Sequence, residues 1–337
     1  MKEVRIALAL GSGAARGWSH IGVIKALKEM GVHIDIVAGT SIGSLVGAGF
    51  ASGRLDEVEA WVRDMGRWQV FNLLDFGFSH GGIIQGEKVF GHARDRFGAV
   101  AIEDLKVIFG AVATDLYTGR EVWLREGDIY DAARASCAMP GLLAPYSNSG
   151  RWLVDGGLVN PVPVSLSRAM GAEFVIAVHL NSQLNTAAIE QRSRHTAPQV
   201  DPEIDVNGEI KASESTETEP EEMPEGEEGF FKNFISTSQD YWDSVKDRFS
   251  SSSADPAVKA PGMFGVMAGA IDIMQERITK ARIAGDPPDI LLQPKLGHIG
   301  LLEFERGNEA IDIGYESTMR MKEYILSELE LYTERLR

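Results

Sequence analysis

The stretch that decides the fold is IDIVAGTSIGSLVGAGF, residues 34–50. Its first half is rich in β-branched side chains and predicts a buried strand over 34–40, while the small residues of 42–50 predict a helix. Between them, Gly39-Thr40-Ser41-Ile42-Gly43 is a G-x-S-x-G sequence in the strand–turn–helix setting that presents a serine hydroxyl at the start of a helix. Gly39 and Gly43 permit the tight turn, so Ser41 is the predicted nucleophile. Ser44, one turn later, is expected to face packing or solvent.

Strand and helix signals alternate on both sides of this stretch. Buried apolar strands that alternate with helices are typical of an α/β fold with a mostly parallel central sheet covered by helices. No internal repeat is visible. The predicted strands are 4–10, 34–40, 107–113, 121–124, 152–154, 174–179 and 290–293, and the predicted helices are 20–30, 42–50, 129–135, 164–170, 263–284 and one long helix from about 309 onward.

Composition excludes several classes of protein. The net charge of -16 over 337 residues leaves no basic footprint for nucleic acid. The single cysteine, Cys137, cannot form an internal disulfide, and no Cys/His cluster has metal-ligand spacing, so no metal site is expected. The apolar run at 6–10 is too short for a signal peptide, and 36–53 is too rich in Gly and Ser for a spanning helix. We therefore expect a cytoplasmic protein whose contact with lipid, if it has one, is peripheral.

An acidic segment interrupts the two globular parts. Between Asp201 and Glu228 there are twelve acidic residues against the single Lys211, a local net charge of -11 out of -16. With three prolines and almost no large apolar side chain, this segment cannot offset its ordering entropy by burial. The sequence predicts a catalytic domain over 1–180 plus 262–337 and a disordered, low-complexity insertion over 181–261. No protein partner of the insertion can be named.

One part of the insertion, about 230–249, has aromatic and aliphatic residues three or four apart, which predicts an amphipathic helix. Two interpretations remain open: a helix docked on the core, or a lid or interface helix whose aromatic side touches lipid or a partner. Its polar side mixes acidic and basic residues, so attraction to anionic lipid is not indicated.

A glycine-rich loop follows the first strand: Gly11-Ser12-Gly13-Ala14-Ala15-Arg16-Gly17. Small residues before a helix let backbone N–H groups point at a developing negative charge, so this loop is the candidate oxyanion hole. The competing interpretation is a dinucleotide fingerprint, but Arg16 stands where the third glycine belongs. Asp35 also falls at the start of the next strand rather than at its end, where a ribose would bind.

A nucleophilic serine needs a base. Most of the histidines fall in loops, helices or the insertion; His20 and His179 are the two that could approach the active end of the sheet. The better candidate is Asp155 in Val154-Asp155-Gly156-Gly157, where a short strand ends in a carboxylate followed by two glycines that allow a close backbone approach.

These three motifs, 11–17, 39–43 and 155–157, resemble in order and spacing the patatin-like phospholipase family. The flanking sequences 17–23, 135–140 and 284–289 are similar in particular to its bacterial RssA-type branch. The resemblance covers about 256 residues and leaves out the insertion, whose role it does not explain.

The resemblance implies a three-layer fold and a serine acyl-ester hydrolase that cleaves fatty acyl esters of phospholipids or lysophospholipids through an acyl-enzyme, without metal or organic cofactor. Ser41 and Asp155 would form the Ser–Asp dyad; Gly11, Ser12, Gly13 and Gly17 match the oxyanion loop, Arg16 would help hold an anionic group, and Gly39, Gly43, Gly156 and Gly157 support the motifs. Ser12 stands where many members have glycine, which is harmless if only its N–H is used. The alternatives are a thioesterase or general carboxylesterase, or a regulatory binding protein that uses the fold and its acidic insertion.

Overall fold

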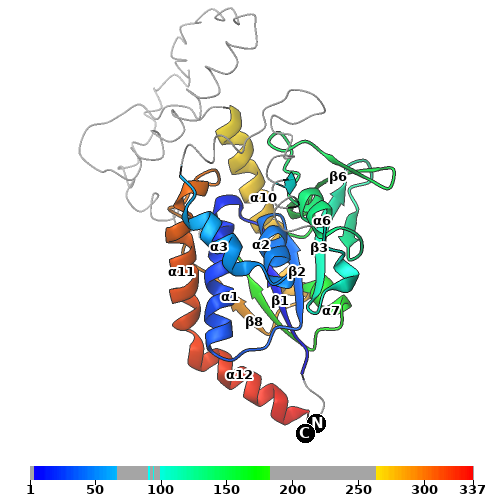
Figure 1. Cartoon of the computed structure of the whole chain (residues 1–337). Helices are drawn as coiled ribbons and strands as arrows, with labels where there is room; N and C mark the ends of the chain where they lie inside the picture. Colours follow the sequence, from blue (N-terminus) through cyan, green and yellow to red (C-terminus); the bar gives the residue numbers. More distant parts are fainter. Residues whose placement is uncertain (1–3, 67–89, 92–93, 95–98, 183–262, 337) are drawn as a thin grey trace, which may run out of the picture. The chain divides into compact units, whose positions relative to one another are not determined.

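The computed structural model describes residues 4–66, 90–91, 94, 99–182 and 263–336 (Figure 1). Met1–Asn185 and Ile271–Arg337 belong to one compact unit, and the site lies within it. The predicted acidic insertion, from residue 183 on, and its predicted helix at 230–249 lie outside the described residues, as do His80, His92 and His195.

The described strands form one eight-stranded sheet in which the predicted parallel core is present. Each parallel strand is a short apolar run that is buried on both faces, as strands covered by helices on both sides require. The parallel strands are β1 (Ile6–Leu10), β2 (Ile36–Thr40), β3 (Ile108–Asp115), β7 (Phe174–Val178) and β8 (Ile290–Leu292), and the antiparallel strands are β4 (Glu121–Leu124), β5 (Tyr146–Asn148) and β6 (Arg151–Asp155).

Helices cover both faces of the sheet (Figure 1). Alternate strand residues divide between two apolar clusters: Leu8 and Leu10 of β1 join the cluster that includes α1, α2 and α6, and Ala7 and Ala9 join the cluster that includes α7. The helices are α1 (Ser19–Glu29), α2 (Ile42–Ala51), α3 (Leu55–Arg63), α6 (Ile129–Ser136), α7 (Val164–Ala169), α10 (Met263–Gly285), α11 (Gly307–Met319) and α12 (Lys322–Arg335).

Three elements differ from the sequence-based expectation, and the first is the short strand β5, which is absent from the predicted strands. The single C-terminal helix is two helices, because α11 ends at Met319 and α12 begins at Lys322. Neither Gly nor Pro marks this break, so the apolar pattern continues through it. The structure also adds α3, where Leu55, Val58 and Val62 have helical spacing. None of the described helices is long and apolar enough to cross a bilayer.

Candidate active site

Ser41 lies in the turn between β2 and α2, with φ 54° and ψ -127°. A left-handed φ is unfavourable for a residue with a side chain and is typical of functional turns. The turn also needs Gly43, because a Cβ there would lie 2.2 Å from the Leu10 carbonyl oxygen. The N–H of Ser41 donates to Ser136 Oγ at 2.9 Å. The serine is thus held at the carboxyl end of β2 by the backbone and by α6.

The register of β3 explains why Ser41 and Asp155 meet although 114 residues separate them. One side of β3 pairs with β4 over residues 111–114. The other side pairs first with β2, up to Thr40 opposite Val112, and then with β6, which ends at Asp155 opposite Ala113. Because β6 is antiparallel, β2 and β6 approach each other end to end along β3. Their last residues therefore bring the serine and the carboxylate together.

The two side chains form a hydrogen-bonded pair. Ser41 Oγ donates to Asp155 Oδ2 at 2.6 Å, and the N–H of Gly157 donates to Asp155 Oδ1 at 2.7 Å. Asp155 is only 1% exposed. Burial raises its pKa to about 6, although the hydrogen bonds from Ser41 and Gly157 act in the opposite direction. The carboxylate is therefore a stronger base than an aspartate in water and is still ionised at neutral pH.

The glycine-rich loop lies beside this pair. A Cβ on Gly17 would lie 2.1 Å from Ile42 Cγ2, so Gly17 packs directly against the residue after the nucleophile. The N–H groups of Gly11 and Ser12 already donate to the carbonyl oxygens of Val178 and Pro161, at 3.1 and 2.8 Å.

Two amides of this loop remain available. Gly13 and Ala14 have no acceptor for their N–H groups among the described residues, and Ala14 has a left-handed φ of 48°. Among the described residues, the loop N–H groups without an acceptor are therefore those of Gly13 and Ala14. Gly13 belongs to the predicted set, whereas the N–H groups of Gly11 and Ser12 are already bonded.

His20 supports the loop and does not contact Ser41. Its Nε2 lies 2.8 Å from the Gly11 carbonyl oxygen; because a carbonyl only accepts, Nε2 carries the proton and donates. Burial lowers the pKa of His20 to about 4, so the ring is neutral at physiological pH. His179 is likewise engaged elsewhere, with Nε2 2.6 Å from Glu276 Oε2. Of the three predicted base candidates, Asp155 is therefore the one that bonds Ser41 Oγ.

Arg16 is buried and bound within the protein. Its Nη1 donates to Asn181 Oδ1 at 3.1 Å and forms an ion pair with Asp272 Oδ2 at 3.2 Å, and its Nε donates to the Ile299 carbonyl oxygen at 2.8 Å. These contacts join the glycine-rich loop to α10 and to residues 296–303, which we call the support loop. Arg16 thereby fixes the loop in place, and two of its nitrogens are already used.

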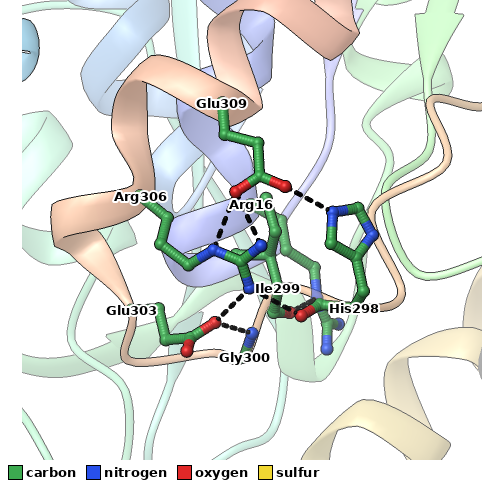
Figure 2. Close-up of polar contacts among 7 residues, drawn as sticks. All are labelled: Arg16, His298, Ile299, Gly300, Glu303, Arg306 and Glu309. Carbon is green, nitrogen blue, oxygen red and sulfur yellow. Dashed lines mark hydrogen bonds and ion pairs between the residues drawn. The ribbon is translucent and has the colours of Figure 1, made fainter. Parts of the chain in front are cut away.

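The support loop is itself clamped by Arg306 (Figure 2). Arg306 Nη1 donates to the carbonyl oxygen of His298 at 2.8 Å and to Glu303, and its Nε and Nη2 bind Glu309 Oε2. On its inner side the loop accepts from Arg16 through Ile299 and from the N–H of Ala15 through Leu301, at 3.0 Å. A surface ion-pair network is therefore connected to the residues next to the free amides.

The sequence-based prediction missed the contribution of α10. Four of its five buried residues are polar and follow helical spacing, so the inward face of this helix is mainly polar; they are Asp272, Gln275, Glu276 and Thr279, and the fifth is Ile271. Gln275 lies against Gly157, where a Cβ would be 2.4 Å from its Nε2. The sequence shows these residues as a polar stripe with helical period in a mostly apolar helix, a pattern that does not by itself indicate burial.

Comparisons with known proteins identify a family and several relatives. The patatin-like phospholipase family matches residues 8–167. An uncharacterized NTE family protein of Mycobacterium tuberculosis is 36% identical over 320 residues, which cover 92% of this chain and 89% of that protein. Two longer proteins match over 188 residues, 54% of this chain. They are patatin-like phospholipase domain-containing protein 6 of Homo sapiens (37% identical, 14% of its length) and neuropathy target esterase sws of Drosophila melanogaster (34%, 13%).

Proposed function

Because the chain belongs to the patatin-like phospholipase family, whose members are lipid hydrolases, we propose that it cleaves fatty acyl esters of phospholipids or lysophospholipids with a Ser41–Asp155 dyad. The observation that carries the proposal is the 2.6 Å hydrogen bond from Ser41 Oγ to a buried carboxylate at the end of a neighbouring strand. The buried thiol of Cys137 also lies next to Ser41, but burial raises its pKa to about 12, so it stays protonated at neutral pH and Asp155 is the base.

The acylation step uses the groups already in contact. Asp155 accepts the Ser41 proton while Oγ attacks the acyl carbonyl carbon, and the oxyanion that forms is held by the free amides of Gly13 and Ala14. The protonated Asp155 then donates its proton to the leaving alcohol oxygen. A positioned base contributes about 10²–10⁴ in rate and one oxyanion donor about 10²–10³, which suffices for ester cleavage.

Deacylation repeats the same chemistry with water. Asp155 takes a proton from a water molecule that attacks the acyl-enzyme, and returns it to Ser41 Oγ when the fatty acid leaves. Because its pKa is about 6, Asp155 is ionised at neutral pH yet basic enough to accept a proton in both steps.

The test is hydrolysis of p-nitrophenyl butyrate and of lysophosphatidylcholine by wild type, Ser41→Ala, Asp155→Asn and Ser52→Ala. Ser52 is the matched control, because it is a serine at the C-terminal end of α2 whose hydroxyl bonds the Ala48 carbonyl. We expect the first two variants to lose activity and Ser52→Ala to retain it. A fluorophosphonate should also phosphonylate Ser41 Oγ with loss of fluoride, giving a phosphonyl mass increase in wild type and Ser52→Ala.

Equal turnover by wild type and Ser41→Ala would refute the assignment of the nucleophile. Inactivity of the folded wild type on esters and thioesters, with no fluorophosphonate adduct, would favour a regulatory binding protein instead. Turnover of acyl thioesters with no turnover of lysophosphatidylcholine would indicate a thioesterase.

A further inference from the structure

Exposed apolar side chains gather at one end of the sheet. Leu116 and Tyr117 follow β3, and Trp152 lies in β6; the N–H of Leu116 donates to the Trp152 carbonyl oxygen at 2.9 Å, so the two segments are adjacent. These three side chains are between 37% and 80% exposed. Scattered apolar residues on a surface need no explanation, but neighbouring Trp, Tyr and Leu side chains do.

Helix α10 adds two more apolar side chains. Its inward face is the polar stripe described above, whereas Ile273 and Met274 are 61% and 48% exposed. This arrangement is the reverse of an ordinary surface helix, which buries its apolar stripe. We call Leu116, Tyr117, Trp152, Ile273 and Met274 the apolar rim.

The rim lies beside the dyad. Trp152 precedes Asp155 by three residues in β6, which is about 10 Å along the strand and places its side chain on the opposite face of the sheet. On the other side, Asp272 and Gln275 on the inward face of α10 contact Arg16 and Gly157, and Ile273 and Met274 lie on the outward face of the same turn. Both parts of the rim therefore belong to elements that reach the end of the sheet at which Ser41 and Asp155 meet.

Charge near the rim differs from that of the whole chain. Arg120 and Arg151 are exposed next to Tyr117 and Trp152. The segments 115–120 and 146–152 contain one acidic residue, Asp115, which lies near Arg151 and whose Oδ1 accepts the N–H groups of Tyr117 and Thr118. The next acidic residue, Glu121, pairs with Arg282 at 2.6 Å. Two arginines thus flank this part of the rim in a protein of net charge -16.

We propose that the apolar rim, with Arg120 and Arg151, docks the protein on an anionic lipid bilayer and brings lipid acyl esters to Ser41. Tyrosine and tryptophan place an apolar ring and a polar tip at the headgroup level, and arginines there bind anionic lipid. This inference rests on the proposed function, because it supplies the route by which a bilayer lipid reaches a buried serine.

Binding is measured by co-sedimentation with phosphatidylcholine vesicles containing or lacking phosphatidylglycerol. All proteins carry Ser41→Ala so that turnover does not alter the vesicles. The test variant is Leu116→Ser/Tyr117→Ser/Trp152→Ser. The matched control is Tyr324→Ser/Leu326→Ser/Leu331→Ser in α12, where three side chains are 37% to 51% exposed and which Figure 1 shows at the opposite end from β6.

We expect the test variant to bind anionic vesicles about tenfold or more weakly and the control to bind like its parent. Arg120→Gln/Arg151→Gln should weaken binding to anionic vesicles by about fivefold per arginine, and should leave binding to pure phosphatidylcholine unchanged. Unchanged affinity in the test variant would overturn the proposal, and equal loss in the α12 control would show non-specific adsorption.

A labelling experiment avoids dependence on the folding of the triple variant. The native Cys137 is buried, and burial raises the pKa of its thiol to about 12, so a polarity-sensitive dye reacts selectively with Tyr117→Cys. We expect a blue shift of its emission on vesicles and none from a dye at Tyr324→Cys. No shift at position 117, with the protein bound, would place the contact elsewhere.

Turnover measurements distinguish failure of the docking proposal from failure of the proposed hydrolase function. In a protein that retains Ser41, the test substitutions Leu116→Ser/Tyr117→Ser/Trp152→Ser should leave hydrolysis of soluble p-nitrophenyl butyrate at the wild-type rate. They should abolish turnover of vesicle lipid. If wild type hydrolyses no ester but binds vesicles through the rim, the hydrolase proposal fails and docking stands. If the triple variant that retains Ser41 hydrolyses vesicle lipid as well as wild type does, the docking proposal fails and the hydrolase proposal stands.

Discussion

Asp155 combines two properties that oppose each other in solution: it is buried at the catalytic serine, and it must be ionised to act. Burial raises its pKa to about 6, while the N–H of Gly157 and the hydroxyl of Ser41 bind its ionised form. The residue thereby gains basicity without losing its charge at neutral pH. His20 has a different task, since its one hydrogen bond goes to the carbonyl of Gly11.

The ionisation of Asp155 should be visible in the pH dependence of activity. Since only the carboxylate accepts a proton, kcat/KM for p-nitrophenyl butyrate should rise with pH through an apparent pKa of about 6 and stay level above it. Asp155→Asn should lower kcat by about 10²–10⁴ and abolish this dependence. A profile whose midpoint stays near pH 4 would mean that burial does not tune this carboxyl.

His20 should act through the position of the loop amides. His20→Leu leaves the Gly11 carbonyl without its donor, which costs about 1–3 kcal/mol of stability and lets the peptide rotate. We expect kcat to fall about tenfold or more with little change in KM, since the loop acts on the transition state. His20→Gln, which keeps an N–H donor, should recover most of kcat. If Leu and Gln variants of equal stability lose kcat alike, His20 has no positioning role.

At the scale of elements, the site is assembled where separate segments end. β2 and β6 meet end to end along β3, η1 (Ala14–Trp18) continues the glycine-rich loop, and α10 and the support loop bind Arg16 from outside. The support loop has little regular structure of its own, so its position depends on the Arg306 clamp (Figure 2).

Removing the Arg306 contacts should therefore lower activity, because the support loop that they hold binds Arg16 and Ala15 of the glycine-rich loop. Arg306→Gln removes the ion pairs to Glu303 and Glu309 and should lower kcat by about fivefold, equivalent to about 1 kcal/mol. Arg320→Gln is the control, because Arg320 pairs with Glu316 at the far end of α11. Equal kcat in the two variants, measured with p-nitrophenyl butyrate, would show that the clamp does not reach the site.

For the whole molecule, two buried groups shift stability with pH in opposite directions. His20 has a native pKa of about 4, below its ordinary 6.5, so the unfolded chain takes up the proton first and stability falls as pH drops from 6.5 to 4. Asp155 has a native pKa of about 6, above its ordinary 3.8, so the native state takes up the proton first and stability rises as pH drops from 6 to 3.8. Each effect amounts to about 3 kcal/mol, so they nearly cancel.

Asp155→Asn should remove the stability cost of burying the Asp155 carboxylate. At pH 7 the variant should be more stable than wild type by about 3 kcal/mol, because no charge is buried, and this advantage should vanish near pH 4. The measurement is urea unfolding of both proteins at several pH values. A constant difference between the two proteins would show that Asp155 has the same pKa in the folded and unfolded states.

The sequence by itself determined the alternating strands and helices, the turn at Ser41, the glycine-rich loop and the identity of the aspartate candidate. These features are local, because a run of apolar strand residues, a glycine in a turn or an apolar helix face is specified by residues that are close in sequence. The sequence missed the break between α11 and α12, because no residue there marks it.

Only the tertiary structure decided which loop amides are free, that His20 holds the loop, and that Arg16 is bound to Asp272. The contact between Arg16 and Asp272 joins residues 256 positions apart, and the carbonyls that accept from Gly11 and Ser12 belong to Val178 and Pro161. The pairing of β2 and β6 along one side of β3 also depends on register, which a single strand does not specify. The polar inward face of α10 was decided in the same way, because only the folded environment shows which side of a helix is buried.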